Sequence, residues 1–453
     1  MSSSATWSTR LSFLLAAVGA AVGLGNIWKF PYMTGTNGGA AFVVVYLVAV
    51  IAIAIPILTA ELMLGRRGRG SPPTAMATVA RESGRSSAWS LVGWLGALAG
   101  FLIVSFYSVI AGWALAYVLK TGIGEFSGAA AADSAASFAA LQASPGALLF
   151  WHSLFMVLTV VIVARGLNRG IEAAVRILMP ALFVMLAAMV AYAAVAGDFA
   201  SAWAFLFRFE AGAVDGGVVL MAIGQAFFSI GVSMGLMMMY GAYLPAGEPI
   251  PSQSVVIALA DTLVAILAGL AIFPLVFAHG LDPAEGPGLI FVTLPIAFGN
   301  MPFGALFGCL FFVLLVFAAL TSAIALLQPT VARLQEHPAV TPAMGAAIAG
   351  LGAWLLGIVS VLSFNLWSEV RPLSWLPHFA GYTPYDLIDY VTANVMMPLG
   401  GMLIAAFAGW LVRHDVLAEE LSNMPRPAFV LWRLSARFIA PVGILLVFVA
   451  NVT

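Results

Sequence analysis

The chain has 453 residues, of which 62% are hydrophobic and 8% charged, and its formal net charge is −1. Folded soluble domains are about 45 to 50% apolar and about 25% charged, so this composition excludes a soluble globular protein. The near-neutral charge gives no reason to expect nucleic acid as a partner, and the single cysteine, Cys309, cannot build a disulfide framework. We expect one membrane domain over residues 1–453.

Long apolar runs follow one another along the chain, and a run of about 20 residues crosses a hydrocarbon core of about 30 Å. In chain order the predicted spans are approximately Arg10 to Met33, Ala40 to Gly65, Ser87 to Lys120, Leu148 to Ala164, Ile171 to Ala196, Val218 to Leu244, Ser252 to Ala278, Phe303 to Leu334, Ala343 to Leu362, Thr383 to Val412 and Leu431 to Asn451. The sequence therefore predicts an all-α polytopic membrane protein with about eleven transmembrane helices.

The positions of arginine predict the orientation in the membrane. Ten arginines fall on one side if the N-terminus is cytoplasmic: Arg66, Arg67, Arg69, Arg81, Arg85, Arg165, Arg169, Arg333, Arg413 and Arg426. Cytoplasmic loops carry the excess of positive charge, so we expect a cell (inner) membrane protein with its N-terminus cytoplasmic and its C-terminus outside. The N-terminus lacks the features of a cleaved signal peptide, so the first helix is expected to be retained.

Two connecting segments stand out on the outer side. The segment from Gly124 to Gly146 reads as a small-residue outer loop without arginine. The segment from Gly286 to Gly304 is apolar and interrupted by proline and glycine, and we expect it to fold back as a cap over a cavity.

The first span carries "AVGAAVGLGNIWKFP", in which Gly19, Gly23 and Gly25 fall within two turns. Glycine costs about 1 kcal/mol relative to alanine in a helix, so we expect this span to unwind near its middle. The sixth span carries "GQAFFSIGVSMG" over residues 224–235, which predicts a second break. Backbone groups freed in hydrocarbon are tolerable only where they line a cavity or hold a ligand, and a cation suits carbonyls. Small residues that only allow close helix packing are the structural alternative.

Breaks in the first and sixth spans are the spacing of an inverted repeat of five spans plus five. We expect repeat one over residues 10–196, repeat two over 218–412 and an extra helix over 431–451. Paired discontinuous helices indicate a midplane substrate site in secondary transporters. Glu61, in the second span, is expected to accept hydrogen bonds from the broken sixth span.

Four sequence features then point to one family: Trp7 before the first span, "GNIWKFPYMTGTNGGAAF" within it, "GQAFFS" in the sixth span and "LTSAIALLQP" in the eighth. Together they resemble the neurotransmitter:sodium symporter family, and the likeness extends over all eleven spans in order. The resemblance implies a LeuT-type fold, sodium-coupled uptake of a small amino acid or amine, and alternating access around a central site.

The resemblance also implies two sodium sites. The second would be formed by the carbonyls of Gly19, Val22 and Ala318 with the hydroxyls of Thr321 and Ser322. The first would be formed by the carbonyl of Ala21 with the side chains of Asn26, Ser229 and Asp261. Oxygen ligands suit a hard cation. Asp261 stands where the family often has asparagine, and a carboxylate at mid-bilayer needs a cation or a proton.

Chloride-dependent members of the family hold the anion with residues that match Tyr46, Gln225 and Ser229, and with a serine at the position of Ala265. Ala265 has no hydroxyl to donate to chloride. We therefore expect Asp261 to supply the negative charge and transport to be independent of chloride. The alternative is a protonated Asp261 that makes a structural hydrogen bond.

The substrate class follows from Gly23, where the family's monoamine carriers have an aspartate that meets the substrate amine. A substrate with its own carboxylate could use that space, beside the first sodium, and Tyr107 matches the family tyrosine that binds such a carboxylate. The site is expected to be formed by Ala21, Gly23, Ile103, Tyr107, Phe228, Gly231, Met234, Ser322 and Leu326. No charged group is among them, which favours neutral, apolar or aromatic L-amino acids.

The resemblance to the family also implies which residues form the outer and inner gates. Phe228 with Tyr107 resembles the thin outer lid, and Lys29 with Asp389 resembles the outer ion pair, although the family usually has arginine at the position of Lys29. The inner gate positions match Trp7, Tyr243 and Glu336.

Two features concern opening toward the inside. The family's usual N-terminal arginine is replaced by Ser4, so the inner latch is weaker or Arg10 takes part. Gly170 and Pro180 have the family's spacing in the fifth span, where unwinding would admit water to the second sodium.

Other classes of protein remain to be weighed. A membrane enzyme would need clustered catalytic groups, whereas the five histidines scatter toward span ends and loops, where most would be solvated or interfacial. A channel is disfavoured because a closed, capped pocket binds rather than conducts. A sodium-coupled carrier of an amine or osmolyte, and a non-transporting amino-acid sensor of the same fold, are the alternatives that the residues leave open.

Overall fold

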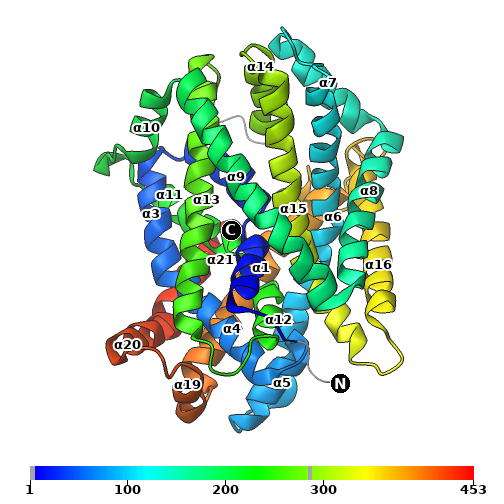
Figure 1. Ribbon diagram of the computed structural model, residues 1–453. Coiled ribbons are helices and arrows are strands. Elements are labelled where there is room, and N and C mark those ends of the chain that lie inside the picture. The colour runs from blue at the N-terminus through cyan, green and yellow to red at the C-terminus, as the bar shows by residue number, and fades with distance from the viewer. Residues whose placement is uncertain (1–5, 284–287, 453) are drawn as a thin grey trace.

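The computed structural model describes residues 6–283 and 288–452, and every regular element in these ranges is a helix (Figure 1). The first half contains α1 Arg10–Ala21, α2 Phe30–Thr36, α3 Ala40–Ala49, α4 Ile55–Gly68, α5 Pro72–Glu82, α6 Ser90–Gly122, α7 Ala131–Ala143, α8 Pro145–Ala164, α9 Ala173–Ala196 and α10 Phe199–Phe207. The second half contains α11 Gly216–Ser229, α12 Leu236–Ala242, α13 Ile250–Ala278, α14 Leu294–Gly299, α15 Gly304–Gln335, α16 Pro342–Ser363, α17 Pro384–Tyr390, α18 Met397–Ala406, α19 His414–Glu420, α20 Arg426–Leu434 and α21 Ala440–Val452.

Within the described residues, nine helical stretches are long and apolar enough to cross a membrane. The pair Arg10–Ala21 and Gly25–Thr36, bent by 51°, makes a tenth. The short helices α11 and α12, separated by residues 230–235, occupy the place of the expected sixth span. The all-α polytopic fold class is confirmed, and the chain is a multi-pass membrane protein with about nine or ten apolar spans.

Both expected breaks are present, and the second has unusual backbone angles. After α1 the chain leaves the helix at Val22, and a π-helical turn over Gly25–Lys29 leads into α2. Between α11 and α12, Gly231, Ser233 and Gly235 have φ angles of 70°, 72° and 73°. Glycine adopts this left-handed region freely, but Ser233 pays about 1–3 kcal/mol for it. Its amide donates to the buried Glu61 carboxylate, which holds the break in place.

The expected outer loop and cap have more structure than the sequence indicates. The segment from Gly124 to Gly146, expected to be a small-residue loop, contains the helix α7, which the sequence analysis did not predict. In the cap segment, Gly286 lies outside the described residues, and Leu289–Gly299 forms two short consecutive helical pieces. The Phe291 ring packs edge-on against Trp28 and Trp113, so the cap contacts the outer half of the first span.

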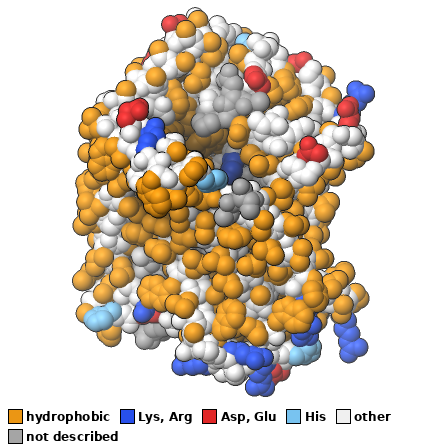
Figure 2. Space-filling view, turned by 180° about the vertical axis from the view of Figure 1, so that it is seen from behind, with side chains coloured by type: hydrophobic (Ala, Val, Ile, Leu, Met, Phe, Trp, Pro, Cys, Tyr) orange, Lys and Arg blue, Asp and Glu red, His pale blue; other side chains and the backbone are white. Residues whose placement is uncertain are grey.

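The two ends of the bundle differ in charge. Lysine and arginine side chains gather at the end that carries the N-terminus, α5 and α19, at the bottom of Figures 1 and 2. There Arg66 pairs with Glu420 at 2.6 Å, and Arg67 pairs with Glu82 and Glu419. These bonds hold α4 to α5 and α19, and the pairing with Arg67 keeps the pKa of Glu82 below its ordinary value.

His152 is an exception to the expected surface placement of the histidines. It is fully buried in α8, its Nδ1 lies 3.0 Å from the Ser108 hydroxyl and its Nε2 lies 3.1 Å from the Trp354 carbonyl. These two contacts satisfy both ring nitrogens. His152 therefore links α8 to α6 and α16 as a packed core residue.

The closest helix contact near the broken sixth span is at Gly65 of α4. A Cβ placed there would lie 1.8 Å from the Met238 carbonyl oxygen of α12, an approach that only glycine allows. We predict that Gly65→Ala destabilises the protein by about 1–3 kcal/mol through overpacking. Thermal unfolding in detergent, followed by loss of the monodisperse peak in size-exclusion chromatography, measures this.

Gly146→Ala is the matched control, because a Cβ at this exposed position in the first turn of α8 meets nothing within 4 Å. It should leave the melting temperature unchanged or raise it. Equal melting temperatures for the two variants would contradict the tight α4–α12 contact.

Candidate functional site

The hydroxyls of α15 meet the carbonyls that end α1. The Ser322 hydroxyl lies 3.1 Å from the Val22 carbonyl oxygen and 3.3 Å from that of Gly19, and donates to them. The Thr321 hydroxyl lies 3.0 Å from the Ala318 carbonyl oxygen. Ser322 thus contacts two of the carbonyls expected at the second sodium site, whereas Thr321 bonds to its own helix and its Cβ lies 3.1 Å from a Cβ placed at Gly19.

A second polar cluster joins the first, sixth and seventh spans. The Asn26 amide nitrogen donates to Oδ1 of Asp261 at 2.8 Å and to Oγ of Ser229 at 3.0 Å, and the Ser229 hydroxyl donates to Oδ2 of Asp261 at 2.6 Å. All three side chains are buried, and Ala21 lies at the end of α1 nearby in sequence. The carboxylate is the only charged member, which makes the cluster chemically suited to one monovalent cation.

The positions matched to the chloride site lie beside this cluster. The Tyr46 hydroxyl donates to Oγ of Ser229 at 3.3 Å, and Gln225 donates to the Gly25 carbonyl at 3.0 Å. Ala265 is buried in α13, about one turn after Asp261. The nearest formal negative charge to Tyr46 and Ser229 therefore belongs to Asp261 itself.

The residues expected to bind the substrate lie around the break in the first span. The Tyr107 hydroxyl accepts a hydrogen bond from the Leu24 amide at 3.2 Å. A Cβ at Gly23 would lie 2.6 Å from Oγ of Ser322 and 2.9 Å from the Tyr107 hydroxyl, so no larger side chain fits without movement. The other residues expected at the substrate-binding site are apolar and are buried or half-buried. They lie on α6, α11, the second break and α15, and they are Ile103, Phe228, Gly231, Met234 and Leu326.

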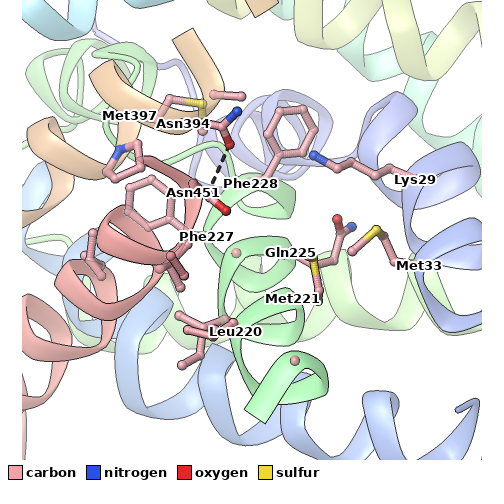
Figure 3. A pocket seen from close by; sticks show the side chains of 18 residues that line it. Lys29, Met33, Leu220, Met221, Gln225, Phe227, Phe228, Asn394, Met397 and Asn451 are labelled. Atoms are coloured by element: carbon pink, nitrogen blue, oxygen red, sulfur yellow. Dashed lines mark hydrogen bonds between the residues drawn. The ribbon is translucent and has the colours of Figure 1, made fainter. Parts of the chain in front are cut away.

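A cavity of about 360 Å³ lies beside the first break, between α2, α11, α18 and α21 (Figure 3). Phe228 lines it and also contacts Gly25 at the break, so its ring lies between the cavity and the first span. The Lys29 ammonium sits 4.0 Å from the centre of the Phe228 ring, as Figure 3 shows. Asp389 acts electrostatically on Lys29, but no ion pair within 4.0 Å joins them among the described residues.

Aromatic rings pack together on the side of the two breaks that carries Trp7 and Tyr243. The Trp7 indole donates to the Tyr240 carbonyl at 3.1 Å, its backbone amide donates to the Tyr243 carbonyl, and its ring packs edge-on against both tyrosines. Gln328 of α15 donates to the Tyr243 hydroxyl at 3.0 Å. The structure therefore brings Trp7 and Tyr243 together at the inner end of the first and sixth spans.

Glu336, the third expected inner gate residue, has other partners. It accepts hydrogen bonds from the Ser71 amide at 2.9 Å and the Thr74 hydroxyl at 2.8 Å, and pairs with Arg333 at 2.7 Å. Burial raises its pKa, but these bonds outweigh the burial and place the pKa below its ordinary value. Glu336 thus ties α15 to the start of α5, and it does not contact Trp7 or Tyr243 in the described part of the chain.

The N-terminal segment is held by residues that the sequence analysis did not select. The Ser8 hydroxyl and amide both donate to the Glu172 carboxylate, and Asn168 donates to the Thr6 carbonyl at 3.2 Å. Arg176 donates to Ser8 at 2.7 Å and to Ser12, and also pairs with Glu172. We name this network the N-terminal clasp, formed by Ser8, Ser12, Asn168, Glu172 and Arg176.

The clasp sits on the segment expected to unwind. Gly170 lies in a π-helical turn over Leu167–Glu172, and Pro180 lies in the continuous helix α9. In this conformation the segment is therefore helical. Ser4 lies outside the described residues, and the clasp uses Arg176 where the sequence analysis considered Arg10. The signal in the sequence was "NRGIEAAVR", which puts Asn168, Glu172 and Arg176 four residues apart on one helix face.

Comparisons with known proteins give the class and the family. The chain is 38% identical to the sodium-dependent transporter YhdH of Bacillus subtilis (strain 168), over 98% of this chain and 96% of the relative. It is 32% identical to a sodium-dependent transporter of Haemophilus influenzae, over 98% of both chains. The crystal structure of MhsT in complex with L-phenylalanine matches with a TM-score of 0.89 and 42% identity, covering 99% of each chain.

Fold, site and relatives together define a sodium-dependent membrane transporter. The sequence profile of the Sodium:neurotransmitter symporter family matches residues 4–129 and 139–453. The chain belongs to this family, which is a family of transporters.

The N-terminal clasp generates a prediction about the mobility of the N-terminal segment, residues 6–21. Glu172→Gln removes the charge that binds Arg176 and weakens the bonds from Ser8, and a hydrogen bond to a charged group contributes about 1.5–3 kcal/mol. We predict about tenfold faster hydrogen–deuterium exchange over residues 6–21, measured by mass spectrometry.

Glu125→Gln is the matched control, because it removes an ion pair with Lys120 of 2.7 Å at the outer end of the bundle. Its exchange over residues 6–21 should equal that of the parent protein. Unchanged exchange in Glu172→Gln would show that the clasp does not hold the N-terminal segment.

Proposed function

We propose that the protein is a sodium-coupled symporter that imports neutral, hydrophobic or aromatic L-amino acids by alternating access. One observation carries the proposal: two backbone breaks meet at two oxygen-rich clusters beside the Tyr107 hydroxyl, with an uncharged apolar lining around them. The resemblance to MhsT, whose structure contains L-phenylalanine, supports an aromatic amino acid as substrate.

The two clusters would each bind one sodium ion as a co-substrate. In the second site, Thr321 and Ser322 would turn their lone pairs to the ion together with the carbonyls of Gly19, Val22 and Ala318. In the first, Asp261 and Ser229 would bind the ion with the Ala21 carbonyl, and the Asn26 amide would present its oxygen instead of its nitrogen. Carboxylate, hydroxyl and carbonyl oxygens are ligands that hard cations prefer.

The substrate would lie between the first sodium and Tyr107. Its carboxylate would accept a hydrogen bond from the Tyr107 hydroxyl, and Ser322 and Tyr107 would have to move away from Gly23 for substrate to occupy the position of a side chain there. Its apolar side chain would contact Phe228, Met234 and Leu326. Met234 is adaptable in shape, and Gly231 adds no bulk, which suits substrates of different sizes.

Alternating access would move the half-helices on each side of the breaks. Phe228, Lys29 and Asp389 would close the outer path, and Trp7 with Tyr243 would open the inner path. Unwinding between Gly170 and Pro180 would then admit water to the second sodium. We place the protein in the cell (inner) membrane with its N-terminus in the cytoplasm and its C-terminus outside, because the arginine-rich end also carries the N-terminus.

Two sodium ions carry enough energy for uphill uptake. Two charges that move with a zwitterionic substrate contribute about 4.6 kcal/mol at about 100 mV. A tenfold sodium gradient adds about 1.4 kcal/mol for each ion.

A ligand screen tests the function. We predict that hydrophobic and aromatic L-amino acids raise the melting temperature of the purified protein in sodium and not in potassium, by mass action on the native state. Thr321→Val should abolish the sodium-dependent shift. Thr159→Val is the matched control, because Thr159 is also buried and bonds only to its own helix.

Three outcomes separate the alternatives. A shift with amines or osmolytes and none with amino acids would contradict the proposed substrate class. Sodium-dependent binding without counterflow of labelled amino acid in proteoliposomes would identify a sensor. Equal shifts in sodium and potassium would contradict the coupling.

The charge of Asp261 generates the prediction on chloride. We predict equal uptake in chloride and gluconate, because the Asp261 carboxylate is the negative charge beside the first sodium. Asp261→Asn should lower the apparent sodium affinity at least tenfold, whereas Asp415→Asn, which removes an exposed carboxylate, should not.

A steep chloride requirement in the parent protein would contradict the proposed role of Asp261. Unchanged sodium affinity in Asp261→Asn would favour the alternative in which a protonated carboxyl makes a structural hydrogen bond.

A further inference from the structure

The last membrane-spanning stretch, Arg426–Asn451, presents an apolar surface to the outside of the bundle. Its lower part includes exposed large apolar side chains, among them Val430, Leu431, Leu434 and Phe438. Figure 1 shows α20 at the edge of the molecule beside α19, at the end where arginines gather. In a membrane-spanning chain such a surface lies against lipid.

Two arginines interrupt this apolar surface one helical turn apart. Arg433 makes no hydrogen bond and no ion pair with any residue in 6–283 or 288–452, and its Nε is buried. Arg437 donates through Nε to the Gly409 carbonyl at 2.7 Å, and its guanidinium lies 4.7 Å from the centre of the Trp410 ring. These contacts orient Arg437 but provide no negative charge.

Several other arginines at this end of the molecule form ion pairs, although the exposed Arg426 makes none with the residues that the structure describes. Arg67 pairs with Glu82, Arg333 with Glu336 at 2.7 Å, and Arg413 with Asp415 at 2.6 Å. Arg433 and Arg437 have no carboxylate within ion-pair distance among the described residues. Two like charges one turn apart repel, and no nearby carboxylate among the described residues offsets that repulsion.

We propose that Arg433 and Arg437 bind the phosphate of an anionic phospholipid. Guanidinium groups present several donors in a planar fork that matches phosphate oxygens. Trp410 is half-exposed, its indole donates to the Arg437 carbonyl at 3.2 Å, and its ring packs edge-on against Phe438, so it fixes the second arginine at the depth of the headgroups.

The occupant is a lipid and not free phosphate, because the surface around the arginines is apolar. Val430, Leu434 and Phe438 lie within one turn of the two arginines and are exposed. Acyl chains would cover these side chains while the headgroup neutralises the arginines. Neither arginine is part of the two oxygen clusters or lines the cavity, so the site adds a binding partner to the proposed transport function.

Lipid titration of delipidated protein tests the site. The protein is purified in a neutral detergent, and its melting temperature is measured with dioleoyl phosphatidylglycerol, with dioleoyl phosphatidylcholine and with inorganic phosphate. We expect a shift with phosphatidylglycerol that is larger than with phosphatidylcholine, and none with inorganic phosphate. The double variant Arg433→Gln/Arg437→Gln should lose the difference between the two lipids.

Arg426→Gln is the matched control, since Arg426 is exposed at the start of the same span and has no ion pair in the described residues. It should keep the full preference for phosphatidylglycerol. Arg433→Lys/Arg437→Lys should keep part of it, and the sodium-dependent amino-acid shift reports whether each variant is folded. Equal shifts with both lipids in the parent protein, a preference retained by the folded double glutamine variant, or a shift with inorganic phosphate alone would each overturn the proposal.

Discussion

The satisfaction of backbone polar groups at the two helix breaks is the constraint on which the rest of the structure depends. A free amide or carbonyl in the membrane interior costs several kcal/mol, so each break needs partners from neighbouring helices. Glu61 accepts from the Ser233 amide, Gln225 donates to the Gly25 carbonyl, and Ser322 donates to the carbonyls at the end of α1. Functional groups of the site are therefore also the groups that make the broken helices possible.

This double role explains how ion binding could control conformation. Asn26, Ser229 and Asp261 connect the first, sixth and seventh spans, whereas Ser322 connects the first span to the eighth. A cation that replaces hydrogen-bond donors in these clusters would hold four spans in one arrangement. When the cation leaves, the same oxygens would again make only hydrogen bonds, which hold the spans less strongly. The half-helices could then move with less resistance.

Local composition predicted the breaks, because closely spaced glycines lower helix stability wherever the chain goes. The family resemblance, and not composition, indicated that Thr321 and Ser322 stand near them. The N-terminal clasp and the position of Lys29 over the Phe228 ring could not be found in this way. Both depend on which helices become neighbours in space. The sequence around an exposed serine or a single lysine does not indicate which distant residue it will contact.

The inner and outer closures of this conformation differ in kind. On the inner side, Trp7 and Ser8 make directional hydrogen bonds to two different spans, and Arg176 adds a charged contact to the clasp. On the outer side, a cavity reaches Phe228, and the Lys29 charge rests on an aromatic ring instead of an ion pair. A cation–π contact is weaker and less directional than a bidentate ion pair. Opening the side that carries the N-terminal clasp therefore requires more hydrogen bonds to break than opening the side that carries the cavity, so the two closures present different barriers to movement of the half-helices.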